Sequence, residues 1–240
     1  MRYLLTITYD GENFSGWQKQ PGRRTVQGEI EKALFTALKE KITITGSGRT
    51  DAGVNAERQV AHFDCEQEIT NLDRLAYSLN GILESDVKIL SIEKSDIHAR
   101  FSAKRKTYKY QMYLSKIVLP LKKKRLRIDD NIDIEMMKSC AKLLIGEHDF
   151  KNFCATNSQV ESTIRRIYSC KFVKEDDNLD FYITGNGFLY KMVRNIVGLL
   201  LEVGKGKVKN TEFEQLAFGK KVLVNKTVAG ENLFLYEVKY

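Results

Sequence analysis

The chain has 240 residues, with 39 lysines and arginines against 31 aspartates and glutamates, and a formal net charge of +8. Hydrophobic residues make up 42% of it, which excludes a disordered chain and is enough for one large core or two small ones. The positive charge favours a polyanionic partner, and nucleic acid is the commonest of these.

The cysteines and histidines predict no metal site. The four cysteines are scattered without a CxxC pair, and the three histidines lack metal-ligand spacing. This cysteine usage is typical of a reducing compartment. The N-terminal stretch MRYLLTITYDG is too short and polar for a signal peptide, and IVGLLLEVG is too short to span a bilayer. We therefore expect a cytoplasmic protein with no metal and no membrane partner.

The first half of the chain alternates strand and helix patterns. Apolar side chains alternate from Tyr3 to Tyr9, as in a strand, and residues 25–40 show helical spacing behind Thr25, a good N-cap residue. Further strands are predicted over 41–45, 57–65 and 87–93, and a second helix over 71–83. The resulting β-α-β-β-α-β order is the plan of ferredoxin-like and RRM-like folds.

The second half is expected to repeat this plan, although its sequence shows no repeat. Strands are predicted over 107–114, 164–173, 179–185 and 233–240, and helices over 134–146, 188–204 and 211–219. We therefore predict an α+β protein of two tandem RRM-like units, 1–104 and 105–240. The functional site is expected in the cleft where the two units meet.

Residues 46–56, GSGRTDAGVNA, form a glycine-rich loop after a predicted strand. A dinucleotide fingerprint would need glycine where Asp51 stands, and a phosphate loop would need lysine after Gly53, so the loop does not suit a phosphate. Extended backbone would point Arg49 and Asp51 to the same side. Either the two side chains bond each other to stiffen a turn, or Arg49 keeps Asp51 ionised for chemistry and also contacts a phosphate or a displaced base.

Arg194 lies in the predicted helix 188–204, whose other side chains are mostly apolar. A helix this apolar is expected to be buried, and a buried arginine needs an anionic partner because an unpaired buried charge is unfavourable. Asp51, reached across the cleft, is one candidate partner. Glu202 of the same helix is the alternative.

Residues 98–113, HARFSAKRKTYKYQMY, interleave tyrosines with cations. Tyr108 and Tyr110 share one face of a predicted strand, and Lys104 and Arg105 precede them, which suits bases stacked beside a phosphate track. The alternative is that one tyrosine faces the core and the cations are only solvated. The basic run KKKRLR, residues 122–127, is likewise a phosphate contact or a solvated loop.

Five stretches carry a resemblance to a known family: TYDGENFSGWQKQPGRRTVQGEIEKAL, GSGRTDAGVNA, HARFSAKRKTYKY, GEHDFKNF and GFLYKMVRNIVG. In this order they resemble the motifs of the TruA family of tRNA pseudouridine synthases, over nearly the whole chain. That family isomerises uridines on the 3′ side of the anticodon stem-loop without a cofactor. The resemblance also implies tRNA as partner and a homodimer whose subunits jointly hold it.

The resemblance implies a role for each matching residue. Asp51 matches the catalytic aspartate, and Arg49 matches the arginine that evicts and replaces the target base. Tyr108 matches the tyrosine that packs on the flipped base, and Arg194 the arginine that pairs with the aspartate. Leu233, in ENLFL, matches an apolar pocket residue. Lys104 and Arg105 are expected to contact the RNA substrate.

Two features depart from the family pattern. Asn55 replaces the histidine of GRTDAGVHA, and NKTVAGENLFL lacks the proline common before the last strand. Both bear on RNA contacts, so a paralogue that modifies another RNA is an alternative. A non-catalytic pair of RRM-like units would explain the charge and the aromatics but not a carboxylate facing RNA. A zinc base deaminase is disfavoured because no H-x-E…P-C-x-x-C signature occurs.

Overall fold

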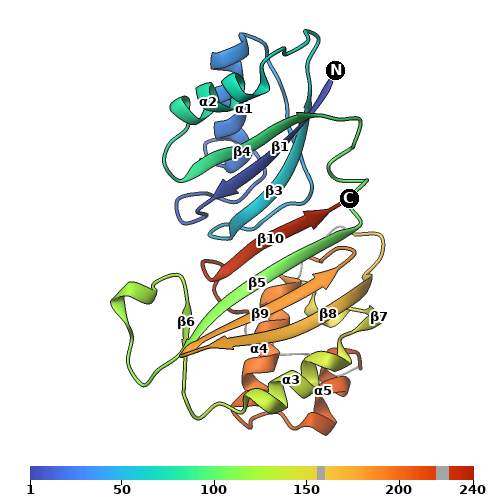
Figure 1. Cartoon of the computed structure of the whole chain (residues 1–240). Coiled ribbons are helices and arrows are strands. Elements are labelled where there is room, and N and C mark those ends of the chain that lie inside the picture. Colours follow the sequence, from blue (N-terminus) through green and yellow to red (C-terminus); the bar gives the residue numbers. More distant parts are fainter. Residues whose placement is uncertain (156–159, 220–226) are drawn as a thin grey trace. The chain divides into compact units, whose positions relative to one another are not determined.

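The computed structural model describes residues 1–155, 160–219 and 227–240 (Figure 1). The chain forms two compact units, the first made of Met1–Lys104 with Phe234–Tyr240 and the second of Arg105–Leu233. Each unit combines a β-sheet with α-helices, so the predicted α+β class is confirmed.

The sheet of the first unit is organised around β3. It contains β1 (Arg2–Tyr9), β2 (Thr45–Gly46), β3 (Asn55–Asp64), β4 (Val87–Lys94) and β10 (Leu233–Lys239). β1 lies between β4 and β3 and is antiparallel to both. The other edge of β3 is shared, because β2 pairs with its C-terminal half at His62 and Ala61 while β10 pairs in parallel with its start at Asn55 and Ala56.

Two capped helices, α1 (Val26–Leu38) and α2 (Leu72–Ile82), lie side by side against this sheet (Figure 1). The Thr25 side chain accepts a hydrogen bond from the Gly28 N–H, so the predicted N-cap is confirmed, and Asn71 caps α2 in the same way. The caps satisfy N–H groups that a helix leaves without partners in its first turn.

The strand predicted over residues 41–45 is wrong except at its last residue. Ile42 and Ile44 are buried as a strand pattern would require, but the backbone of Ile44 is bonded by side chains of α1. Its N–H donates to Glu31 Oε1 at 3.3 Å, and its carbonyl accepts from Gln27 Nε2 at 3.1 Å. Because these side chains satisfy the peptide groups, pairing with β3 begins only at Thr45.

The second unit has an antiparallel sheet in the order β5-β9-β8-β7, with β6 added in parallel to β5. Its strands are β5 (Arg105–Leu114), β6 (Leu126–Ile128), β7 (Gly146–Asp149), β8 (Ile164–Glu175) and β9 (Asn178–Gly185). Two 3-10 turns, Pro120–Lys122 and Lys151–Phe153, lie in its loops. The short strands β6 and β7 were not expected from the sequence, because three or four residues show too little periodicity.

Three helices complete the second unit: α3 (Ile134–Leu143), α4 (Met192–Gly204) and α5 (Asn210–Ala217). α4 begins four residues later than predicted, since Lys191 adopts a left-handed conformation with φ 58° just before it. α3 and α4 approach closely at Gly204, where a Cβ atom would lie 2.6 Å from Met137 Sδ and Ile132 Cγ1.

The contacts within the chain divide it after Lys104 and again after Leu233. The sequence placed all of 105–240 in the second unit, whereas Phe234–Tyr240 belongs to the first. The reason is the short β2, which leaves the start of β3 open for β10.

Candidate active site

The Asp51 loop, residues 47–54, connects β2 to β3. Arg49 is exposed and Asp51 is half-buried, while Thr50 between them is buried. A turn closes at Asp51, whose carbonyl accepts the Val54 N–H at 3.2 Å, and Gly53 has φ 77°. Arg49 and Asp51 thus flank a residue that points into the unit, as extended backbone predicts.

Buried polar groups hold the loop from below. The Tyr9 hydroxyl and Thr50 Oγ1 lie 2.8 Å apart. Gln59 on β3 accepts from Ser47 Oγ at 2.6 Å and donates to the Gly48 carbonyl at 3.0 Å. Burial raises the pKa of Tyr9 to about 12, so its phenol is neutral at physiological pH. The loop therefore rests on uncharged hydrogen-bonding groups.

A second loop, residues 10–17, packs directly on the Asp51 loop through backbone atoms. The Trp17 N–H donates to the Thr50 carbonyl at 3.1 Å, and the Gly53 N–H donates to the Phe14 carbonyl at 3.4 Å. Gly16 has φ 89°, and a Cβ atom there would lie 2.7 Å from the Thr50 oxygen. A Cβ atom at Gly11 would lie 2.2 Å from the Val54 oxygen. Both glycines are required because no side chain fits between the two backbones.

Asn55, at the position of the family's histidine, joins these two loops. Its side chain is only 2% exposed, and its Oδ1 accepts the Gly11 N–H at 2.9 Å. The substitution thus places an amide inside the fold. In the other departing segment, Asn225 and Lys226 lie outside the described residues.

Arg24 anchors the loop 10–17 and was not identified from the sequence. Its guanidinium donates to both carboxylate oxygens of Asp86, at 2.6 and 2.9 Å, and lies 4.2 Å from the centre of the Phe14 ring. Asp86 also accepts the Asp10 N–H through its carbonyl. The hydrogen bonds from Arg24 lower the pKa of Asp86. The only signal in the sequence was the arginine pair before Thr25, which charge alone does not distinguish from a surface pair.

Tyr108 lies on β5 of the second unit and is 8% exposed. Its ring meets Phe188 edge-on, with centroids 5.1 Å apart. Tyr110 is completely buried, and its hydroxyl donates to the Ala229 carbonyl at 3.1 Å. Of the two tyrosines proposed as a stacking platform, Tyr110 therefore belongs to the core.

Arg194 is half-buried among the apolar side chains of α4. Its Nε donates to the Val228 carbonyl at 2.7 Å. Burial raises the pKa of Tyr110, and the nearby positive charge of Arg194 acts against that rise. Glu202 forms ion pairs with Lys205 and Lys207, and eight residues of helix separate it from Arg194 by about 12 Å.

The remaining predicted residues lie near the ends of strands. Leu233 is 5% exposed and begins β10, and its N–H donates to the Gly230 carbonyl. Lys104 and Arg105 are exposed, and the Arg105 guanidinium lies 4.7 Å from the centre of the Tyr168 ring. By unit, Arg49, Asp51 and Lys104 belong to the first, and Arg105, Tyr108, Arg194 and Leu233 to the second.

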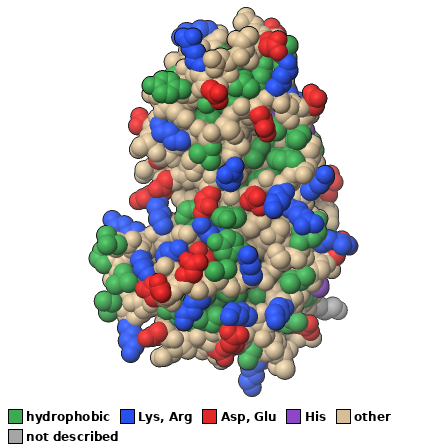
Figure 2. All heavy atoms as spheres, in the orientation of Figure 1, with side chains coloured by type: hydrophobic (Ala, Val, Ile, Leu, Met, Phe, Trp, Pro, Cys, Tyr) green, Lys and Arg blue, Asp and Glu red, His purple; other side chains and the backbone are tan. Residues whose placement is uncertain are grey.

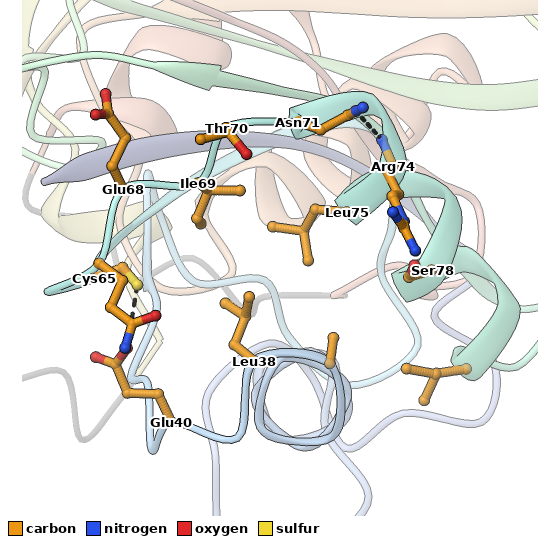
Figure 3. A pocket seen from close by; sticks show the side chains of 13 residues that line it. Leu38, Glu40, Cys65, Glu68, Ile69, Thr70, Asn71, Arg74, Leu75 and Ser78 are labelled. Carbon is orange, nitrogen blue, oxygen red and sulfur yellow. Dashed lines mark hydrogen bonds between the residues drawn. The ribbon is translucent and has the colours of Figure 1, made fainter.

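A hollow of about 380 Å³ opens between α1, α2 and the end of β3, and none of the predicted site residues lines it (Figure 3). Its wall includes the carboxyl groups of Glu40 and Glu68, and Cys65 Sγ donates to Glu40 at 3.2 Å. Burial raises the pKa of the Cys65 thiol, which makes it a poor nucleophile. Cys65 follows the end of β3 and Asp51 precedes its start, so the hollow is not part of the Asp51 site.

Lysine and arginine side chains are spread over the visible face of both units and interspersed with acidic ones (Figure 2). Of the helices in the described ranges, none combines the length and apolarity needed to traverse a bilayer. Residues 1–155, 160–219 and 227–240 contain no group of three His, Cys, Asp or Glu side chains placed to hold a metal ion.

Comparison with known proteins identifies the family. The family described as tRNA pseudouridine synthase matches residues 5–102 and 140–240. The tRNA pseudouridine synthases A of Listeria monocytogenes serotype 4b and Bacillus subtilis strain 168 are each 42% identical over 246 residues, covering 100% of this chain and 99% of each relative. That of Caldicellulosiruptor bescii is 39% identical, covering 99% of this chain and 98% of the relative. The chain belongs to the tRNA pseudouridine synthase family.

Among solved structures, the crystal structure of a Cbf5-Nop10-Gar1 complex matches 82% of this chain and 54% of that one. The TM-score is 0.35 and the sequence identity 16%, which is too weak a likeness to bear on the fold.

Proposed function

We propose that the chain converts uridine to pseudouridine in the anticodon stem-loop of tRNA, with Asp51 as the catalytic carboxylate. The family makes the protein an isomerase that acts on tRNA. The observation that carries the assignment to Asp51 is the way its loop is held. Backbone contacts from residues 10–17 and buried groups beneath fix a half-buried carboxylate beside an exposed arginine.

The reaction has the same atoms in substrate and product. The bond between C1′ and N1 of uridine breaks, the ring turns, and a bond forms between C1′ and C5, with the C5 proton moving to a ring nitrogen. A carboxylate assists either by attacking C1′ as a nucleophile or by removing the C2′ proton to give a glycal. Asp51 is suited to both roles, which its position does not distinguish.

The target base must leave its stack before it reacts, and this costs a few kcal/mol. Tyr108, backed by Phe188, and Leu233 are apolar groups that suit a flipped base. Arg49 is exposed and so suits the space that the base vacates. Arg194 is assigned as the partner that orients the Asp51 carboxylate, because a planar guanidinium matches a carboxylate. Lys104 and Arg105 are assigned to the RNA backbone. The proposal also includes a homodimer that acts in the cytoplasm.

The test is Asp51→Asn, with Asp64→Asn as a matched control. Asp64 carries the same charge at the other end of β3, where it pairs with Arg2. We expect Asp51→Asn to lower single-turnover pseudouridine formation on a tRNA anticodon stem-loop by at least about 1,000-fold. RNA affinity should stay within a few-fold, since the change removes a negative charge that RNA does not favour.

Asp64→Asn should leave both quantities unchanged. Turnover by Asp51→Asn near the wild-type rate would refute the catalytic assignment. Mapping of pseudouridine in bulk RNA, with and without the protein, shows whether the modified uridines lie in the tRNA anticodon stem-loop or in another RNA.

A further inference from the structure

Arg165, at the start of β8, is a half-buried cation held in a defined orientation. Its Nη1 donates to the backbone carbonyls of Ser162 at 2.9 Å and Ile164 at 2.6 Å. Arginine has five N–H donors in a rigid plane, so fixing Nη1 also fixes the direction of the others. The edge formed by Nε and Nη2 therefore points in one direction.

This edge has no protein partner within residues 1–155, 160–219 and 227–240. Neither Nε nor Nη2 of Arg165 donates a hydrogen bond to a described residue, and no described carboxylate pairs with it. The adjacent Arg166 differs, since it pairs with Glu147. No fully buried side-chain nitrogen in the described ranges lacks a partner, so the Nε–Nη2 edge reaches solvent.

Burial nevertheless affects the group, because it lowers the pKa of the Arg165 guanidinium. The Cys154 thiol is the nearby titratable group that acts against this lowering. A cation that loses part of its hydration without a carboxylate partner is stabilised by any anion that reaches it. The Nε–Nη2 edge is the one that binds two oxygens of a phosphate in parallel, as a fork.

The position of Arg165 links it to Tyr108. In the sheet, Gly185 of β9 pairs with Ile167 of β8 on one side and with Lys106 of β5 on the other. The chain then continues to Gly187, where a Cβ atom would lie 3.7 Å from Arg165 Nε, and to Phe188, whose ring contacts Tyr108. The starts of β5 and β8 and the end of β9 thus lie at one end of this sheet (Figure 1).

We propose that the Nε–Nη2 edge of Arg165 binds a backbone phosphate of the RNA strand that delivers the target uridine to Tyr108. This inference rests on the proposed function. A flipped nucleotide keeps its two flanking phosphates close to the receiving pocket, so a phosphate is the anion that this place would meet. Gly187 carries no side chain that could cover the guanidinium.

The experiment combines protein variants with RNA stem-loops in which single phosphates near the target uridine are replaced by uncharged methylphosphonates. The variants are Arg165→Gln, Arg165→Lys and, as a matched control, Arg166→Gln, which removes the same charge from the next residue. We expect Arg165→Gln to lower kcat/KM on unmodified RNA by roughly 10- to 100-fold, as for removal of a charge-assisted hydrogen bond. Arg165→Lys should lose less, because it keeps the charge but not the fork.

The decisive result is whether the effect of the Arg165 variant and the effect of a methylphosphonate depend on each other. One methylphosphonate should weaken the wild type by a similar factor and have no further effect on Arg165→Gln, while Arg166→Gln stays as sensitive as the wild type. The slope of log affinity against log salt should also decrease by about 0.7 for one single-strand phosphate contact. Thermal melts of each variant separate a folding defect from a binding defect, and Arg165→Lys carries the test if Arg165→Gln does not fold.

The inference would be overturned if folded Arg165→Gln had the kcat/KM and the salt slope of the wild type. It would also be overturned if every methylphosphonate weakened Arg165→Gln as much as it weakens the wild type. The failure of the proposed function looks different. In that case the wild type forms no pseudouridine on any RNA tested, and the coupling is measured by RNA affinity instead.

Discussion

The Asp51 loop of the first unit and the Tyr108–Arg194 region of the second are held in place in opposite ways. Around Asp51, main-chain groups of two loops bond each other, and glycines allow the close approach. Tyr108 and Arg194 instead sit on a strand and a helix, where ring contacts and a side-chain hydrogen bond orient them.

This difference determines which changes each region tolerates. Removing an exposed side chain from the Asp51 loop leaves its main-chain bonds intact, whereas adding one methyl group to a neighbouring glycine forces the two loops apart. In the second unit the regular elements keep their backbone, so the identity of each side chain matters most.

Among changes in the residues that support these two regions, the largest effect is expected for Gly16→Ala. The new Cβ atom would approach the Thr50 oxygen to 2.7 Å at a residue whose φ is 89°, so both crowding and backbone strain arise next to Asp51. We expect turnover to fall by roughly 100-fold or more, with about 2–4 kcal/mol lost from the free energy of unfolding.

Gly22→Ala is the matched control for Gly16→Ala. It also has a positive φ of 68°, but no atom lies within 4 Å of its Cβ position. It should lose about 1 kcal/mol from strain alone and keep its turnover. Equal losses of activity in the two variants would show that the packing of the two loops does not position Asp51.

A smaller effect is expected for two arginine-to-lysine changes. Arg194→Lys keeps the charge but loses the planar fork, so it should lower turnover by roughly 10- to 100-fold and hardly change RNA affinity. Arg49→Lys should preserve stability, because Arg49 is exposed, and should impair base eviction. Single-turnover rates on a paired stem-loop and on one with a mismatched target uridine separate the two.

The mismatch should partly rescue Arg49→Lys and not Arg194→Lys. If both respond alike, the two arginines act as one group around Asp51, and the division between a fold-facing and an RNA-facing arginine is wrong.

The smallest effects are expected for the lysines of the basic run 122–127, to which we assign different roles. Lys122 bonds Asp177 and Asn178 and lies 5.3 Å from the centre of the Tyr113 ring, so it serves the fold. Lys122→Gln should lower the free energy of unfolding by about 1 kcal/mol and leave the salt dependence of RNA affinity unchanged. Lys123→Gln with Lys124→Gln should flatten that dependence, by about 0.7 in slope for each RNA phosphate that is no longer neutralised. An unchanged slope would place the run outside the RNA interface.

The sequence was most informative where contacts are local. Helical spacing and the Thr25 cap predicted α1 because a helix is determined by neighbours three and four residues away. The strand 41–45 failed because Gln27 and Glu31 reach the Ile44 backbone from another element. The terminal strand was predicted as a strand, but its parallel pairing with the start of β3 was not, since pairing partners are not encoded in the alternation of a strand.

For the candidate active site too, the sequence predicted local motifs but not contacts between distant residues. Asp51, Arg49 and Tyr108 stand in recognisable motifs, so their identity was open to prediction. The supporting residues Gly11, Gly16 and Arg24 act on the Asp51 loop through contacts with residues 34 to 62 positions away, which no local pattern reveals.

The first unit cannot be completed in the order in which its residues are synthesised. Residues 1–104 leave the ribosome first, yet the strand that pairs with Asn55 and Ala56, directly after the Asp51 loop, comes from residues 234–240. Until translation reaches them, this edge of β3 presents unpaired peptide groups that another strand can capture. A nascent chain therefore finishes the sheet that carries Asp51 only after the whole second unit has been made, and a premature stop codon late in the message would damage the earliest-made part of the protein.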